Sequence, residues 1–345
     1  MNAPLTISPP AAISERELLA ATKPYTVESK WKSWWHVGST LGVITGVLTL
    51  AAIAPWWWLQ LIASILGSLV MVRGFILFHD FAHGAILRKS KVARFLLSVY
   101  SMIFMAGVSY WREAHNFHHA HVSDMRESSQ GSFPVMTLEQ WANATPMQRL
   151  YYRVNRNPVT LLLAYVTVFM FSNTLEPFFR QPIKHWTSGA SVVLHFGIIG
   201  VLWWLGGPMT AFFAFILPYS IAASLGAYLF YAQHNFPEMD LLPEEEWSRV
   251  GASLRSTSYM RLNPFLAWCT GQIGYHHVHH LNSAIPFYRL KEAMRDIPAL
   301  QTAPVTTLNP KDVWSCLRLK LWDEVERRML TWREAREAMR ARALA

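Results

Sequence analysis

The sequence has 345 residues, of which 52% are hydrophobic and only 15% are charged. Its mean hydropathy is positive, at +0.16. These values exclude an ordinary soluble protein and indicate an integral membrane protein. The two cysteines, Cys269 and Cys316, are too few and too far apart for a disulfide framework or a cysteine-based metal site. The net charge of +9 fits the excess of Lys and Arg on the cytoplasmic side of membrane proteins.

The apolar stretches predict the membrane topology. Residues 1–36 lack the apolar core and small-residue cleavage site of a secretory signal, so we expect a cytosolic N-terminal segment. A membrane helix needs about 20 mostly apolar residues. We predict four spanning helices, arranged as two hairpins within a membrane domain over residues 37–300. The expected spans are residues 37–54, 56–78, 190–206 and 209–232.

Three histidine clusters stand next to apolar stretches: HDFAH at 79–83, HNFHHAH at 115–121 and GYHHVHH at 274–280. Each helical residue turns the side chain by about 100°, so positions i, i+3 and i+4 lie on one face. The first two clusters therefore form helix-compatible metal clamps. Imidazole is a common metal ligand at such spacings.

The third cluster leaves one choice open. His276 and His280 are four residues apart and share a helix face. Either His277 or His279 completes a three-ligand arc of equal width. Helix geometry alone does not decide between them.

A metal site shared by all three clusters requires an even number of membrane crossings between them. Residues 95–111 must then be interfacial or re-entrant, and residues 158–175 form a peripheral or partly inserted helix. No Lys or Arg falls between residues 32 and 73, or between residues 184 and 249. The positive-inside rule therefore places every cluster and both termini in the cytosol. In a bacterium this multi-pass protein belongs in the inner membrane.

The C-terminal segment, residues 301–345, is expected to be a cytosolic tail. Its interleaved Arg and Glu residues predict an amphipathic helix over Val313 to Ala343. The expected fold is thus all-α and integral to the membrane, with four transmembrane helices, peripheral helices and a cytosolic helical cap. This cap holds a histidine-rich site for two metals.

The clusters, with QHNF at 233–236 and GYHHVHHLNSAIPFYRL from Gly274, resemble the membrane fatty-acid desaturases over residues 55–300. The acyl-lipid delta-12/omega-6 branch is the most similar. The resemblance implies that the isolated His234 is a ligand, and it favours His279 over His277. The implied metal ligands are His79, His83, His115, His118, His119, His234, His276, His279 and His280.

Nine imidazoles are too many for one metal, because a zinc site takes three or four protein ligands. Nitrogen donors without thiolate suit iron, copper, nickel or zinc, and the resemblance implies two iron ions with O2 as co-substrate. The second nitrogen of each ligand imidazole needs a hydrogen-bond partner. Candidate partners or near neighbours of the ligands are Asp80, Glu113, Asn116, His121, Asp124, Asn235 and His277.

The implied reaction is desaturation: O2 and two electrons remove two hydrogens from adjacent methylenes and leave a cis double bond in a lipid-bound or thioester-bound acyl chain. A fatty acyl hydroxylase, or a carotenoid hydroxylase or ketolase, on the same scaffold is the alternative. A metal transporter would carry ionisable groups deep in its spans. Here the clusters stand at helix exits. The confident spans hold His195, which a hydrogen bond between helices explains, and Arg73 near the end of its span.

The expected partners are membrane lipids and an electron carrier, and no nucleic acid is expected. The sequence contains no further redox-cofactor motif, so two electrons must come from a separate protein. We expect an acidic carrier, such as a ferredoxin or a cytochrome b5 with its reductase. Its expected docking face is basic and comprises Arg88, Lys89, Lys91, Arg94, Arg112 and Arg126.

Overall fold

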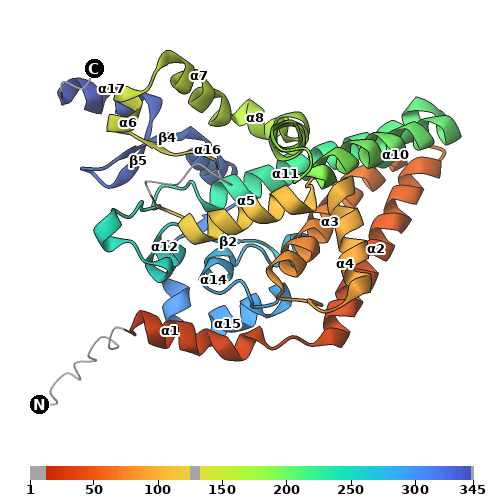
Figure 1. Ribbon diagram of the computed structural model, residues 1–345, viewed down its shortest axis with the longest axis horizontal. Helices are drawn as coiled ribbons and strands as arrows, with labels where there is room; N and C mark the ends of the chain where they lie inside the picture. Colours follow the sequence, from red (N-terminus) through yellow and green to blue (C-terminus); the bar gives the residue numbers. More distant parts are fainter. Residues whose placement is uncertain (1–12, 125–132, 343–345) are drawn as a thin grey trace, which may run out of the picture.

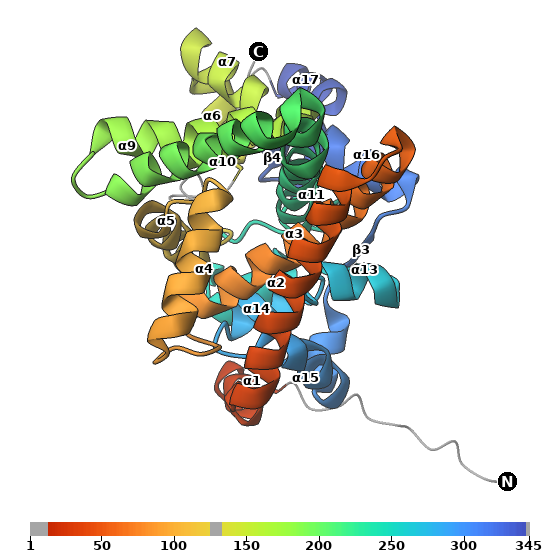
Figure 2. The same cartoon turned by 90° about the vertical axis from the view of Figure 1, so that its right-hand side faces the viewer.

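The computed structural model describes residues 13–124 and 133–342 (Figure 1). Long apolar helices form one part of the molecule, and short helices with two small sheets form the other. The helices α1 and α15 lie at the end away from α9 and α10 (Figure 2). The protein is thus mostly helical, as predicted, but the prediction did not include the sheets.

Within the described part of the chain, three helical stretches are long and apolar enough to cross a membrane. They are α2 (Lys30–Ile53), α3 (Trp57–His83) and the stretch Trp186–Gln233. The last consists of α10 (Trp186–Ala211), the π-helical η3 (Phe212–Ile216) and α11 (Leu217–Gln233).

The stretch Trp186–Gln233 is not a straight rod. Its 48 residues would reach about 72 Å as one helix, more than twice the hydrocarbon thickness of about 30 Å. Gly207 breaks the helix with φ 80° and ψ −177°, and Pro208 follows it. The chain turns back at this end of α10 (Figure 1), where the sequence predicted the turn between residues 190–206 and 209–232.

Residues 95–111, expected not to cross the membrane, fall on two helices that meet at a sharp bend. The helices α4 (Lys91–Ile103) and α5 (Val108–His121) are bent by 89°. Such a bend fits either a broken span or a re-entrant path. Because of this bend, the second histidine cluster, on α5, lies beside the end of α3 that bears the first histidine cluster.

The short elements form a cap over this end of α3. Its α-helices on the histidine side are α1 (Glu15–Thr22), α12 (Arg249–Arg255), α13 (Pro264–Cys269), α14 (His276–Leu281) and α15 (Leu290–Asp296). Those on the other side are α6 (Leu138–Asn143), α7 (Pro146–Asn155), α16 (Pro310–Arg318) and α17 (Trp332–Ala341). The short helices α8 (Pro158–Leu162) and α9 (Glu176–Arg180) lie outside this cap, where α8 packs on α11 and α9 on α10. The π-helix η2 (Tyr165–Leu175) joins α8 to α9. Short 3-10 turns are η1 (Lys23–Thr26), η4 (Glu244–Glu246), η5 (Phe287–Arg289) and η6 (Pro298–Thr302).

The C-terminal segment differs from the prediction of one amphipathic helix. Two strands, β4 (Leu319–Asp323) and β5 (Arg328–Thr331), form an antiparallel hairpin between α16 and α17. The distant strand β1 (Met136–Thr137) pairs parallel with β4. Every residue of β4 is buried, so burial against the rest of the cap overrides the local helical pattern. A second sheet joins β2 (Tyr259–Arg261) to β3 (Val305–Thr307).

Candidate metal centre

The nine histidines predicted as ligands come together in two groups. Within each group, the ligand-capable nitrogens all lie within 4.8 Å of one another. The first group is His79, His83, His115, His119 and His279. The second group is His118, His234, His276 and His280.

The helices divide the sequence clusters between the two groups. On α5, His115 and His119 are four residues apart and point into the first group, while His118 points into the second. On α14 the arrangement is reversed, because His276 and His280 join the second group and His279 joins the first. Adjacent helical side chains differ by about 100° in direction, so one short helix can serve two centres.

The spacing of the Nε2 atoms fits two metal sites. Two ligands about 2.0–2.1 Å from one metal and at right angles are about 3 Å apart. In the first group, the Nε2 of His119 lies 3.1 Å from those of His115 and His279. In the second, the Nε2–Nε2 distances are 3.1 Å for His118–His234, 2.8 Å for His234–His276 and 3.1 Å for His276–His280.

Burial keeps these imidazoles in the form that binds metal. Loss of solvent, followed by the charge of neighbouring histidines, lowers the pKa of His276, His279 and His280 well below the usual value. Each is therefore neutral near pH 7, with a lone pair available. Nitrogen donors with no thiolate suit iron as well as copper, nickel or zinc, so the residues present fit the implied iron without selecting it.

The first cluster is placed by the end of α3. Gly84 ends this helix with φ 75°, a conformation that glycine adopts without strain. The Ala85 N–H donates to the Asp80 carbonyl at 3.0 Å, which closes the last turn. His79 and His83 are thus held on the final turns, beside the cap.

Among the predicted partners, Asp80 directly contacts a ligand histidine. Its Oδ1 lies 3.3 Å from the Nδ1 of His79, and its Oδ2 accepts the N–H of Phe287 at 2.6 Å. A proton on Nδ1 leaves the Nε2 lone pair of His79 free for a metal. Through the Phe287 N–H, Asp80 also links the first histidine cluster to the segment that follows the third cluster.

Three further predicted partners, Asn116, Glu113 and His121, have other surroundings. Asn116 is exposed on α5, and Glu113 pairs with Lys184 at 2.7 Å. His121 stacks on Phe117, and its Nδ1 contacts the Phe117 carbonyl at 2.9 Å. Asp124 is buried and forms an isolated bridge with Leu242.

His277 belongs to neither group. Its Nε2 donates to the Leu300 carbonyl at 2.9 Å, and burial lowers its pKa to about 4. This contact fixes α14 to the η6 turn. His195 is likewise a bridge between helices, as predicted, with ring nitrogens 2.8 Å from the Tyr165 hydroxyl and the Ile103 carbonyl.

Asn235 acts on its neighbour His234 through the backbone and not through the imidazole. Its Oδ1 accepts from the buried Arg156, and its Nδ2 donates to the Cys316 carbonyl at 2.6 Å. The Lys320 ammonium donates to the Arg156 carbonyl at 2.5 Å. The C-terminal segment thus anchors His234, a role that the local sequence around these cations did not reveal.

The glycine before the third cluster, Gly274, permits a close backbone approach. Its carbonyl accepts the Met260 N–H at 2.8 Å. A Cβ on Gly274 would lie 2.4 Å from the Met260 carbonyl oxygen. The strand β2 can therefore approach α14 only beside a residue without a side chain.

We expect Gly274→Ala to destabilise the protein by about 1–3 kcal/mol, as overpacking does, and to reduce bound metal. The backbone of β2 or α14 must move, which displaces the third cluster. Thermal unfolding in detergent and metal analysis measure both effects. Gly226→Ala is the matched control, because nothing lies within 4 Å of a Cβ at Gly226; equal behaviour of the two variants would contradict this account.

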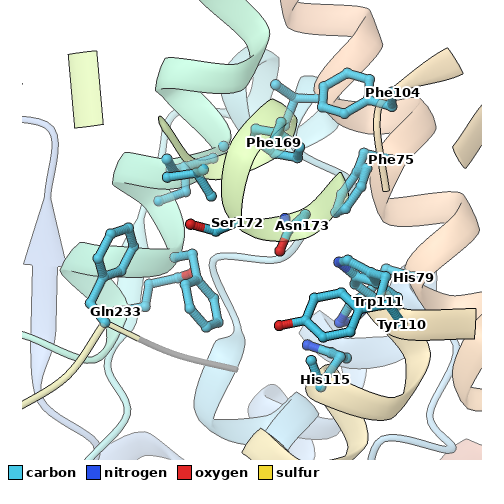
Figure 3. A pocket seen from close by; sticks show the side chains of 18 of the residues that line it. Phe75, His79, Phe104, Tyr110, Trp111, His115, Phe169, Ser172, Asn173 and Gln233 are labelled. Carbon is cyan, nitrogen blue, oxygen red and sulfur yellow. The ribbon is translucent and has the colours of Figure 1, made fainter. Parts of the chain in front are cut away.

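A cavity of about 450 Å³ runs from the helices to the histidines. Its wall is largely apolar and aromatic, and includes Phe75, Phe104 and Phe169 (Figure 3). His79 and His115 of the first group and His276 of the second also line it. Polar residues of its wall include Asn155, Ser172, Asn173, Glu176, Arg180 and Gln233.

Apolar helices, two histidine groups that could each hold a metal ion and an adjoining apolar cavity are typical of a membrane metalloenzyme. Comparison with known proteins gives the family. Residues 55–309 match the model of the family described as fatty acid desaturase. The chain belongs to this family and is an enzyme that desaturates fatty acyl chains.

Individual relatives agree with this assignment. A fatty acid desaturase of Bacillus subtilis is 28% identical over 80% of this chain and 78% of its own length. An sn-1 oleoyl-lipid 12-desaturase of Synechocystis is 25% identical, over 76% of this chain and 74% of its own. An sn-1 acyl-lipid omega-3 desaturase (ferredoxin) of Synechocystis is 22% identical over 80% of this chain and 79% of its own length.

Proposed function

We propose that this enzyme is an O2-dependent acyl desaturase that holds two iron ions with its nine clustered histidines and introduces a cis double bond. The observation that carries the proposal is the division of these histidines into two groups with metal-ligand spacing. Bound iron would supply O2 activation and removal of hydrogen from the acyl chain. His79, His83, His115, His119 and His279 would hold one ion, and His118, His234, His276 and His280 the other.

The cavity supports the choice of substrate. Its apolar wall suits methylenes, and a pocket of this size and composition is typical for small ligands. Because His79 and His276 belong to different groups and both line the cavity, a chain bound there passes both centres. The buried rings of Phe104 and Phe169 exclude water from that part of the chain. Relatives named as oleoyl-lipid and acyl-lipid desaturases favour a lipid-linked acyl group.

Product analysis tests the reaction. The gene is expressed in a host with saturated and monounsaturated lipids, and mass spectrometry locates new double bonds in intact lipids. A new cis double bond that depends on O2 is the expected result. A hydroxyl or keto product would replace the proposal with the hydroxylase or ketolase alternative.

We propose that the electrons come from an acidic carrier that docks on exposed cations near the first group. Arg88, Lys89, Lys91 and Arg94 are exposed just after the first cluster. Arg112 and Arg249 are also exposed, and their charges act on His83, which is itself only partly buried. Arg126 of the predicted face lies outside the described residues. A relative whose name includes ferredoxin supports such a donor.

Donor-dependent turnover should therefore fall as salt rises, since the Debye length is about 8 Å at 0.15 M and steering by opposite charges weakens with ionic strength. Arg112→Glu with Arg249→Glu should slow reduction by an acidic ferredoxin and leave bound iron unchanged. Stopped-flow reduction measures this rate. The control is Arg333→Glu with Arg340→Glu on α17, and equal rates for the two pairs would reject the docking face.

For the membrane topology we propose four spans, with both termini and all histidine clusters in the cytosol. Single cysteines at Glu245 and Glu337, both exposed in the cap, should be protected from an impermeant thiol reagent in intact cells. A cysteine at Trp57, which is 65% exposed at the start of α3, should react. External labelling at Glu245 would contradict the even number of crossings.

A further inference from the structure

The helix α7 is amphipathic, but its apolar face points away from the protein. Met147, Leu150, Tyr151 and Val154 follow the i, i+3, i+4, i+7 spacing of one helix face. Their exposed fractions are 72%, 55%, 65% and 51%. A helix on the surface of a water-soluble cap would bury this face.

The side of α7 that bears the buried Tyr152 faces the cap instead, and the half-buried Arg149 and the exposed Arg153 also contact it. The Arg149 Nε and Nη2 donate to the carbonyls of Trp141 and Ala142 at 3.1 and 2.7 Å. Arg153 lies over the rings of Trp141 and Trp332, at 5.2 and 5.8 Å from their centroids. The buried Tyr152 is hydrogen-bonded to the backbone of β1 and β4. These contacts fix the rotation of α7 about its own axis, so its apolar face is held pointing away from the cap.

Exposed apolar residues continue along the chain after α7, outside the cap. The segment that follows α7, residues 158–175, contains no charged residue. Its exposed fractions run from 49% to 69% at the apolar residues Val159, Leu162, Leu163, Val166 and Phe171. Beyond it, Phe179, Ile183 and Trp186 are 76%, 91% and 62% exposed up to the start of α10. Exposed apolar residues thus recur along the chain from α7 to the start of α10.

Cations flank this surface where a bilayer would present its headgroups. The side chains of Arg180 and Lys184 are 75% and 50% exposed, and each also pairs with a carboxylate at 2.7 Å, Glu176 and Glu113 respectively. Lys and Arg near a membrane surface attract anionic lipid phosphates, and an in-plane helix buries its apolar face at the boundary between headgroups and acyl chains. Apolar side chains beside exposed cations are the composition of such a boundary.

We propose that α7 is an in-plane membrane helix, with Met147, Leu150, Tyr151 and Val154 inserted into the cytosolic leaflet. Tyr151 and Asn155 also line the cavity, as do Glu176 and Arg180. An inserted α7 therefore sets this part of the cavity wall at the lipid surface and not in the cytosol. The partner of this face is the bilayer, neither a second copy of the chain nor a soluble protein.

Depth-dependent quenching tests the proposal on the full chain in lipid vesicles. The variant Leu150→Cys carries the environment-sensitive dye NBD, in phosphatidylcholine–phosphatidylglycerol vesicles with or without doxyl-labelled lipid. Cys269 and Cys316 are buried, so the parent protein serves as the labelling blank. Glu337→Cys on α17 is the matched control, because its side chain is 66% exposed on an outer helix of the cap.

The dye at residue 150 should emit at shorter wavelength than at residue 337 and should lose roughly half or more of its emission to doxyl lipid, as an inserted helix face requires. The same result for a dye at Met147→Cys would show that the apolar face of α7 is inserted along its length. Equal, water-like emission at residues 150 and 337 would overturn the proposal.

A second copy of the chain on this face would give a different pattern. Emission at residue 150 would then be shielded from water but insensitive to doxyl lipid, and the unlabelled Leu150→Cys variant would form a disulfide-linked dimer. That result would overturn the proposal in favour of a dimer interface. The NBD emission does not depend on turnover. An inactive protein whose NBD emission at residue 150 is quenched by doxyl lipid would therefore contradict the proposed reaction but not the insertion of α7.

Discussion

His279→Ala should abolish product formation and remove iron. His277→Ala, in contrast, should keep most of its product formation and most of its bound iron. The Nε2 of His279 lies 3.1 Å from that of His119 within the first group, but His277 is turned to the Leu300 carbonyl. Loss of a direct ligand should reduce activity by at least about 100-fold, since even outer partners of ligands are worth 10- to 100-fold. Product analysis and iron determination on the purified variants measure the two effects.

The same pair of variants controls for folding, because the two residues lie in one short helix and both are buried. His277→Ala should lower the unfolding temperature, since a buried hydrogen bond is lost, without the loss of iron. Alanine at each of the other eight clustered histidines should resemble His279→Ala. A fully active His279→Ala with an inactive His277→Ala would reverse the assignment within the third cluster.

Gly226→Leu should block the acyl cavity and leave the metal centre intact. Gly226 lines the cavity, and nothing lies within 4 Å of a Cβ placed there. A Cβ here meets no other atom, and a larger side chain extends from it into the space of the substrate. We expect kcat/KM to fall by about 100-fold, the scale of a misplaced reacting chain, with iron content unchanged.

Gly200→Leu is the matched control for this experiment. Gly200 is also a helical glycine with open space around its Cβ, but it is exposed on α10 and does not line the cavity. This variant should keep the activity of the parent. Equal losses at both glycines, or normal turnover by Gly226→Leu, would contradict the assignment of the cavity to the acyl chain.

The sequence predicted the parts of this site that depend on local periodicity. The spacing within HDFAH and HNFHHAH placed His79 with His83, and His115 with His119, as the structure does. It did not predict that His118 joins the other group, because that depends on how α5, α11 and α14 pack together. His234 stands alone on its segment, so only the family resemblance singled it out.

The remaining differences come from contacts between distant segments. The strand β4 pairs with β1, about 180 residues earlier in the chain, and a helical charge pattern contains no information about such a partner. The network of Arg156, Asn235 and Lys320 joins three regions in the same way. The direction of the apolar face of α7 depends in the same way on Tyr152, which hydrogen-bonds to the backbone of β1 and β4.

Metal stoichiometry of the active enzyme tests the central claim most directly. The protein is purified from iron-supplied cells, and bound metals are counted by mass spectrometry beside turnover with a reduced donor and O2. We predict two irons per chain, loss of turnover when a chelator removes them, and recovery when iron alone is returned. One metal per chain in fully active enzyme, or turnover that survives complete removal of iron, would contradict the two-iron centre.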